Sequence, residues 1–87
     1  MGPNAEELRI EIEKALPIGT SRDRVVEFAN KHGLEHSNYL ERERMFNAIK
    51  RGVSKGLLSE SSAYVRFYFD DKGTLQRFTV EEVSTSL

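Results

Sequence analysis

Residues 63–80 read AYVRFYFDDKGTLQRFTV, and this stretch decides the fold. Apolar side chains alternate with polar or amphipathic ones over its first part, and this period of two predicts a β-strand with one buried face. The letters DDKG supply a turn, in which Gly73 takes the positive φ that a tight reversal requires. The alternation resumes at Phe78. The sequence therefore predicts an antiparallel hairpin with strands over 62–70 and 74–83.

The register of this hairpin follows from the same alternation. If the large apolar residues of both strands share one face, Phe67 lies opposite Phe78 and Val65 lies opposite Val80. Leu75 does not fit this alternation. We therefore expect Leu75 to lie in the turn or in a bulge that packs against the end of the core.

The opposite, exposed face of the hairpin is the best candidate for a binding surface. The register places Tyr68 opposite Arg77 and Tyr64 opposite Glu81 on this face. Tyrosine and arginine dominate the energetics of protein interfaces, because they bring a large contact area with a fixed polar tip. An antiparallel sheet can also leave one face simply solvated, so both interpretations stay open. The candidate binding residues on this face are Tyr64, Arg66, Tyr68 and Arg77.

Two helices are expected before the sheet. Over residues 4–16 apolar residues recur every three or four positions, which is typical of one buried helix face. Residues 20–32 show the same spacing, with Thr20 as the expected N-cap and Asp23 as its partner in a capping box. Gly33 is expected to end this helix in a Schellman motif. The connection is short, so the two helices should be neighbours in space.

Residues 44–54 allow two interpretations, because Phe46, Ile49 and Val53 fit a helix as well as a strand. A third antiparallel strand with a bend at Gly52 is favoured, since two strands alone would support the hairpin poorly. The sequence thus predicts one α+β domain over residues 1–87, in which two N-terminal helices pack on one face of a three-stranded antiparallel sheet (ααβββ, two layers). The predicted core consists of Leu8, Ile12, Leu16, Val25, Phe28, Ala29, Val65, Phe67, Phe69, Phe78 and Val80.

Composition narrows the classes of function. The 87 residues make one small domain, which leaves no volume for a two-domain enzyme or a deep, closed active site. The net charge of −1 lacks the positive excess of a protein that binds a phosphate backbone, so nucleic acid is not expected as a partner. The printed sequence has no cysteine, which excludes disulfides and thiolate zinc sites.

Three groups of residues could suggest a metal site or a catalytic site, and each has an ordinary structural explanation. His32 and His36 have the spacing of a metal site on a helix, but Gly33 interrupts the helix between them. The turn at 70–73 resembles the start of a calcium loop and lacks its later ligands. The serines of 59–62 lack a nucleophile elbow. We therefore predict no catalytic residue, no cofactor and no metal site, and we do not expect an enzyme.

The charge is unevenly distributed along the chain. Residues 41–57 carry a net charge of +3 within a chain whose total is −1. These cations can be solvated charges that keep a strand edge from aggregating. They can also contact an acidic protein surface or anionic lipid headgroups. The second interpretation adds Lys50, Arg51 and Lys55 to the candidate binding residues.

The order of elements and two motifs resemble a known family. GTSRDRV at residues 19–25 begins the second helix, and VRFYFDDKGTL at residues 65–75 forms the hairpin. Over residues 14–83 the chain resembles the SmpA/OmlA (BamE-like) family of small bacterial outer-membrane lipoprotein domains, which is related in fold to the domain of β-lactamase inhibitor protein. The resemblance implies a two-layer α+β fold whose members bind other proteins.

This resemblance sets the functional expectation. It implies a non-enzymatic module that binds a protein through its exposed sheet face, similar to the small lipoprotein component of bacterial outer-membrane assembly. An inhibitor or immunity-type protein that occludes a partner's site is one alternative, and a small enzyme or ligand-binding domain is another. The implied location is the bacterial cell envelope or periplasm. The printed sequence shows neither a signal peptide nor a lipobox cysteine, so the cytoplasm is the alternative; a monomer or weak dimer is expected.

Overall fold

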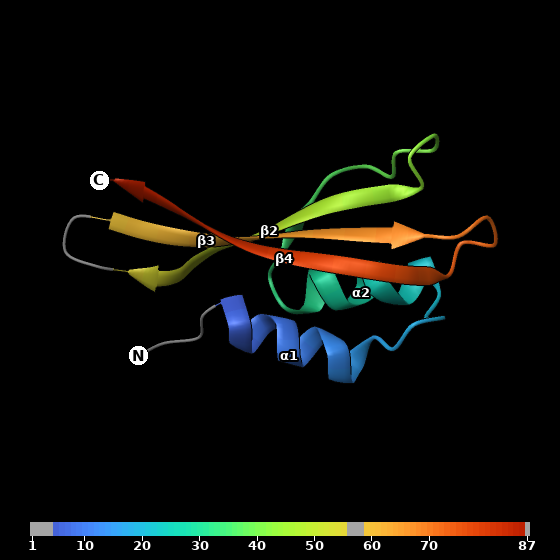
Figure 1. Cartoon of the computed structure of the whole chain (residues 1–87), viewed down its shortest axis with the longest axis horizontal. Coiled ribbons are helices and arrows are strands. Elements are labelled where there is room, and N and C mark those ends of the chain that lie inside the picture. Colours follow the sequence, from blue (N-terminus) through green and yellow to red (C-terminus); the bar gives the residue numbers. More distant parts are fainter. Residues whose placement is uncertain (1–4, 56–58, 87) are drawn as a thin grey trace.

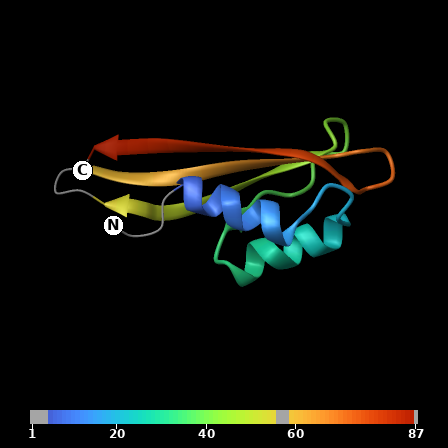
Figure 2. The ribbon, with the colours of Figure 1, turned by 60° about the horizontal axis from the view of Figure 1, so that its bottom comes forward.

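Two helices and a four-stranded antiparallel sheet make up the fold. The computed structural model describes residues 5–55 and 59–86. The helices are α1 (Ala5–Ala15) and α2 (Arg22–Lys31), and the strands are β1 (Glu35–His36), β2 (Met45–Lys55), β3 (Ser59–Phe69) and β4 (Leu75–Ser86). The strands lie in the order β1-β2-β3-β4, and each neighbouring pair is antiparallel. Both helices lie on the same side of the sheet, so the chain forms two layers (Figures 1 and 2).

The prediction of a three-stranded sheet is wrong, because β1 lies beside β2 as a fourth strand. Glu35 pairs with Ile49, and just beyond β1 the amide of Ser37 donates to the carbonyl of Asn47 at 2.8 Å. Both residues of β1 are exposed. A strand this short has no alternation of buried and exposed positions, which is the signal by which a strand is recognised in a sequence.

The register of β3 and β4 is the one that the sequence predicts. Phe67 lies opposite Phe78 and Val65 lies opposite Val80, so this prediction is confirmed. Leu75 lies at a shift of register at the start of β4 and is only 1% exposed. The predicted bulge that packs against the core is therefore confirmed as well.

The second strand contains a larger irregularity. Its register against β3 shifts between Lys50 and Ser54, and Gly52 in this interval has a φ of 68°. Glycine adopts this conformation without the steric cost that other residues meet. The segment is thus a strand with a bend at Gly52, as the sequence favours, and the alternative interpretation as a helix is wrong.

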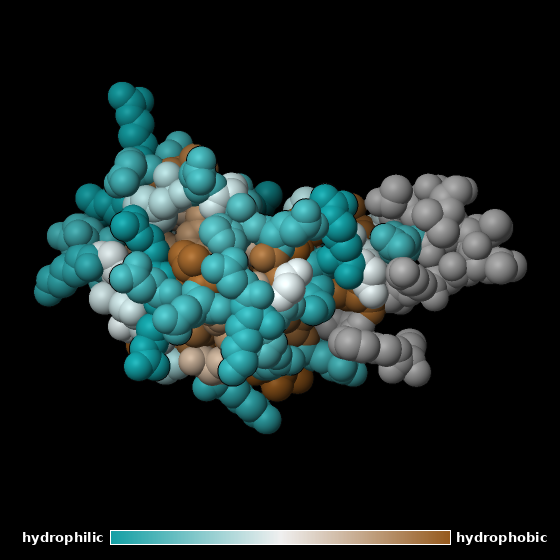
Figure 3. Space-filling model, turned by 180° about the vertical axis from the view of Figure 1, so that it is seen from behind, coloured by the Kyte–Doolittle hydropathy of each residue, from teal (hydrophilic) through white to brown (hydrophobic). Residues whose placement is uncertain are grey.

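The core fills the space between the helices and the inner face of the sheet, which is the face toward the helices. Phe46 and Phe67 contact each other there, with ring centroids 5.3 Å apart. Phe78 and Val80 are only half-buried, because β4 is an edge strand. From the helix side, Figure 3 shows mainly hydrophilic side chains with smaller hydrophobic areas between them. The buried apolar residues are Leu8, Ile12, Leu16, Val25, Phe28, Ala29, Leu34, Phe46, Ala48, Val53, Ala63, Val65, Phe67, Phe69 and Leu75.

The N-terminus of α2 differs from the prediction. Its N-cap is Ser21, whose hydroxyl accepts a hydrogen bond from the amide of Arg24 at 3.4 Å, so the prediction of Thr20 as the cap is wrong. The hydroxyl of Thr20 donates instead to the carbonyl of Pro17, and the carbonyl of Thr20 accepts from the amide of Leu75. Because these bonds hold the connection against the start of β4, the helix begins later than predicted.

The C-terminus of α2 has the predicted Schellman motif. Gly33 has a φ of 72°, and the amide of Leu34 donates to the carbonyl of Ala29 at 2.8 Å. A side chain from the sheet adds a further bond at this end. Nζ of Lys50 donates to the carbonyl of His32 at 2.7 Å, so β2 helps to fix the end of α2.

Candidate functional site

The candidate site is the outer face of the sheet, which is the face away from the helices. In Figure 1 this face is toward the reader, and the helices lie behind it. At its centre, three residues from each of β2, β3 and β4 lie side by side, because the register brings them to one face. We call these residues the outer-face grid. They are Met45, Asn47 and Ile49 from β2, Tyr64, Arg66 and Tyr68 from β3, and Arg77, Thr79 and Glu81 from β4.

Arg66 lies at the centre of the outer-face grid. Asn47 and Thr79 are its cross-strand partners, and Tyr64 and Tyr68 are its neighbours on the same face of β3. Arg66 is exposed, and no carboxylate in the described part of the chain forms an ion pair with it. Its guanidinium, with five N–H donors in a planar fork, is therefore available to a partner.

The two tyrosines beside Arg66 differ in how they are held. The guanidinium carbon of Arg77 lies 3.8 Å from the ring centroid of Tyr68. A cation–π contact at an exposed site is worth about 0.5–1 kcal/mol, so it limits the motion of this ring before any partner arrives. Tyr64 is 44% exposed. Together the rings provide contact area, and the ordered ring of Tyr68 loses less conformational entropy on binding.

A shallow hollow of about 350 Å³ lies beside the grid, toward β1. Its lining includes the apolar Ile49 and Tyr64 together with Glu35 and Arg51. Nε of Arg51 lies 2.6 Å from a carboxylate oxygen of Glu35, and this hydrogen bond together with the carboxylate charge raises the pKa of the guanidinium. The hollow thus combines apolar walls with an ion pair, which suits a single partner side chain.

The structure separates the basic residues that the sequence groups together. Lys50 lies on the inner face of β2, where it donates to the carbonyl of His32. Arg51 lies beside the outer-face grid. Lys55 belongs to β2, and its side chain lies outside the described residues. Of the described side chains in this set, only Arg51 is placed to join the predicted Tyr64, Arg66, Tyr68 and Arg77.

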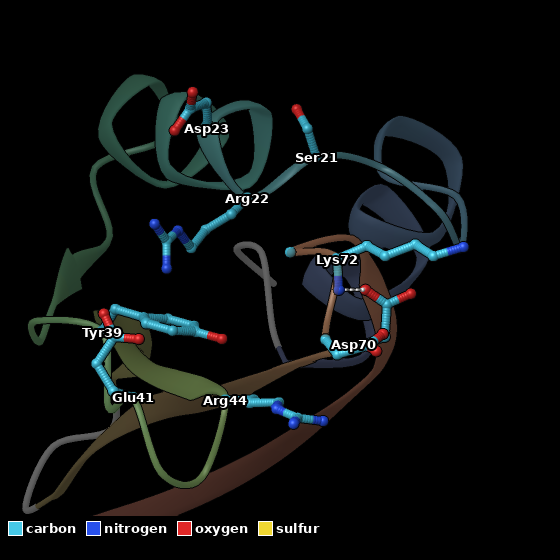
Figure 4. A pocket seen from close by; sticks show the side chains of 10 residues that line it. Ser21, Arg22, Asp23, Tyr39, Glu41, Arg44, Asp70 and Lys72 are labelled. Atoms are coloured by element: carbon cyan, nitrogen blue, oxygen red, sulfur yellow. Dashed lines mark hydrogen bonds between the residues drawn. The ribbon is translucent and has the colours of Figure 1, made fainter.

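A second, polar pocket of about 460 Å³ lies at the end of the sheet where β2 begins and β3 ends (Figure 4). The N-terminus of α2, the loop before β2 and the β3–β4 turn surround it, and its lining includes Arg22, Tyr39, Arg44, Asp70 and Lys72. The guanidinium carbon of Arg22 lies 4.1 Å from the ring centroid of Tyr39. Because acidic and basic side chains both line the pocket, it has no clear preference for an anion or a cation.

Asp70 in this pocket organises the hairpin turn. Its Oδ1 accepts from the amides of Lys72 and Thr74, each at 2.9 Å, and its Oδ2 accepts from the Thr74 hydroxyl at 2.6 Å. These hydrogen bonds lower the pKa of the Asp70 carboxyl. The bond from the Thr74 hydroxyl has the largest effect, and the bond from the Thr74 amide has the next largest. The aspartate is thus engaged in a turn, as the sequence indicates.

The two histidines have separate partners. Nδ1 of His32 lies 2.8 Å from a carboxylate oxygen of Glu11, and its ring stacks on Phe28 with centroids 4.1 Å apart. The ring of His36 contacts that of Phe46, with centroids 5.5 Å apart. Within residues 5–55 and 59–86, no three His, Cys, Asp or Glu side chains gather to hold a metal ion.

The three β2 residues of the outer-face grid are not among the candidate binding residues identified from the sequence. Met45, Asn47 and Ile49 alternate with Phe46 and Ala48, which are buried. This alternation is a usable signal. The bend at the middle of the strand and the competing helical spacing obscure it.

No family model, no curated protein and no solved structure matches the chain. The resemblance to the SmpA/OmlA family therefore stays a prediction. Among the described residues, no helix has both the length and the apolar character that crossing a membrane requires.

Proposed function

We propose that this chain is a non-enzymatic protein-binding module that contacts its partner through the outer-face grid. The observation that carries the proposal is the exposed Arg66, which has no ion pair among the described residues, with Tyr64 and Tyr68 on either side of it along β3. The strand that presents these residues is hydrogen-bonded on both sides, by β2 and by β4. A rigid sheet therefore holds the contact residues in fixed positions.

Arginine and tyrosine at the centre of a patch are the residues most often found as energetic hot spots. Loss of one such residue typically costs about 2 kcal/mol of binding free energy, which is roughly a 30-fold loss of affinity. The exposed guanidinium of Arg66 favours a partner that supplies a carboxylate, because the two groups form paired, charge-assisted hydrogen bonds. The tyrosine rings would contact apolar atoms around that carboxylate.

The resemblance to the SmpA/OmlA family agrees with this proposal and suggests where to search for the partner. We expect the partner to be a protein of the bacterial cell envelope, because the chain resembles the small lipoprotein component of outer-membrane assembly. Anionic lipid headgroups are a weaker expectation, since Lys50 and Arg51, the two cations of β2 whose side chains are described, point to opposite faces of the sheet.

The test is quantitative capture of proteins from detergent-solubilised envelope extract by the tagged chain. The double variant Arg66→Ala with Tyr68→Ala is compared with the wild type and with Arg24→Ala, a control on the exposed surface of α2. We expect wild type and control to retain the same protein, and the double variant to retain less than about a tenth of it. Equal retention by the double variant, with its fold verified by circular dichroism, would overturn the proposal.

A further inference from the structure

The edge of β4 that faces away from β3 is a second surface of the sheet, and it does not include Tyr64, Arg66 or Tyr68. At the start of β4, Leu75 accepts from the amide of Gly19 at 2.8 Å and donates to the carbonyl of Thr20 at 2.7 Å. Beyond Leu75, no described residue outside β3 forms a main-chain hydrogen bond with β4. The pairing with β3 is regular from Arg77 to Ser86. A long, regular, unpaired edge is a template for another strand.

The hydrogen-bond pattern determines which β4 residues direct their main chain outward. The amide of Phe69 donates to the carbonyl of Arg44, so the main-chain groups of Phe69 point toward β2. In an antiparallel sheet this direction repeats at every second residue of β3, and the β4 residues opposite those positions point their N–H and C=O away from β3. Over residues 78–82 these are Phe78, Val80 and Glu82.

The side chains of the same residues lie on the inner face, beside α1. Phe78 and Val80 are half-buried, so part of each remains open at the edge. Ala5 and Arg9 of α1 form a groove of about 290 Å³ with Val80 and Glu82. The inward side chains of an added strand would cover the open parts of Phe78 and Val80 and enter this groove.

The charges of the edge disfavour a second copy of this chain. Glu81 and Glu82 are neighbours in β4, and neither has an ion pair within the described residues. Antiparallel pairing of two β4 strands about these positions would place like charges opposite each other, which is destabilising. Pairing centred closer to Leu75 would bring the C-terminal end of one copy against the connection at Gly19 that already occupies the edge of the other.

We propose that the β4 edge binds an extended segment of another protein as an added antiparallel strand. The segment carries basic side chains opposite Glu81 and Glu82 and apolar side chains opposite Phe78 and Val80. Main-chain hydrogen bonds supply the affinity, and the two faces of the strand supply the selectivity. Read from its N-terminus, the segment is basic, basic, apolar, β-branched, apolar.

The probe for this proposal is the capped and fluorescently labelled peptide Lys-Lys-Val-Thr-Val, titrated against the full chain at low salt. We expect saturable binding, with NMR amide shifts confined to β4 and α1. Two altered peptides test the mode of binding without changing the protein. The acidic peptide Glu-Glu-Val-Thr-Val should bind at least about tenfold more weakly than Lys-Lys-Val-Thr-Val. The basic peptide with an N-methyl group on its central valine should be weakened by the same factor, because the methyl group removes one main-chain hydrogen-bond donor.

A charge exchange gives the reciprocal test. The variant Glu81→Lys with Glu82→Lys should lose affinity for the basic peptide and gain affinity for the acidic one, each by about tenfold. Arg66→Ala should leave both affinities unchanged, so this proposal and the proposed role of the outer face fail separately. Equal binding of all three peptides, shifts outside β4 and α1, or no binding at millimolar peptide would overturn the proposal.

Discussion

Lys50→Met separates a structural cation from the cations that we assign to binding. The ammonium group of Lys50 is part-buried and donates to the carbonyl of His32, which is the C-cap residue of α2. Methionine keeps the length and the apolar stem of lysine and removes the donor and the charge. The carbonyl at the helix end then loses its partner from β2.

The expected loss is about 2 kcal/mol of unfolding free energy, because hydrogen bonds that involve a charged group contribute roughly 1.5–3 kcal/mol. A domain of this length has a total stability of about 4–13 kcal/mol, at roughly 0.05–0.15 kcal/mol per residue. The loss is therefore a substantial share of the total. It corresponds to a fall in Tm of about 10 °C, since 1 kcal/mol shifts a domain of this size by about 4–8 °C.

The assay is urea unfolding followed by circular dichroism, with Lys31→Met as the matched control. Lys31 lies in the last turn of the same helix and is exposed, so its replacement removes the same charge without removing the bond to His32. We expect the control to lose less than about 0.5 kcal/mol. Equal losses in the two variants would refute the structural role of Lys50. Reduced capture of the partner by a folded Lys50→Met variant would refute its exclusion from the binding residues.

Three further predictions concern stability. Phe67→Ala should cost about 3–5 kcal/mol of unfolding free energy, because Phe67 is fully buried, and Phe78→Ala on the half-open edge should cost clearly less; similar urea midpoints for both would contradict the assignment of the core. Gly33→Ala should cost about 1–2 kcal/mol, since its φ of 72° is unfavourable for alanine, and an unchanged midpoint would argue against this helix ending. The pKa of Asp70 is lower in the folded chain than its ordinary value of 3.8, so its carboxylate stabilises the fold above that value and loses this effect as the pH falls through the lower, folded pKa. The stability difference between wild type and Asp70→Asn should therefore shrink as the pH is lowered below about 4, and a difference independent of pH would contradict the hydrogen bonds at the turn.

The hairpin could be predicted from the sequence down to its cross-strand pairs. Phe67, Phe78, Val65 and Val80 are large apolar residues in a stretch of strict alternation, so only one parity of pairing buries them all. The same parity isolates Leu75, which the structure places in the bulge. The alternation of apolar and polar residues and the turn residues at 70–73 are sufficient to predict this hairpin, because the interactions that decide its structure are local in sequence.

Elements that depend on distant partners could not be predicted in the same way. Strand β1 exists because β2 pairs with it, and its two exposed residues have no pattern of their own. Thr20 and Ser21 are both residue types that cap helices, and the bonds between the connection and Leu75 place the cap at Ser21. Lys50 has the same parity in β2 as the buried Phe46, which indicates the inner face, whereas its charge favours an exposed position in any interpretation of the sequence alone.

The most direct test of the central claim is photo-crosslinking at two positions that are equally exposed. Tyr64 on the outer face and Ile10 on α1 are both 44% exposed, so a photoreactive phenylalanine analogue at either position meets solvent to a similar extent. If the outer face is the binding surface, irradiation of cells that express the two variants should give a discrete covalent adduct with another protein from position 64, and position 10 should not give that same adduct. The same adduct from both positions, or an adduct from position 10 alone, would contradict the account.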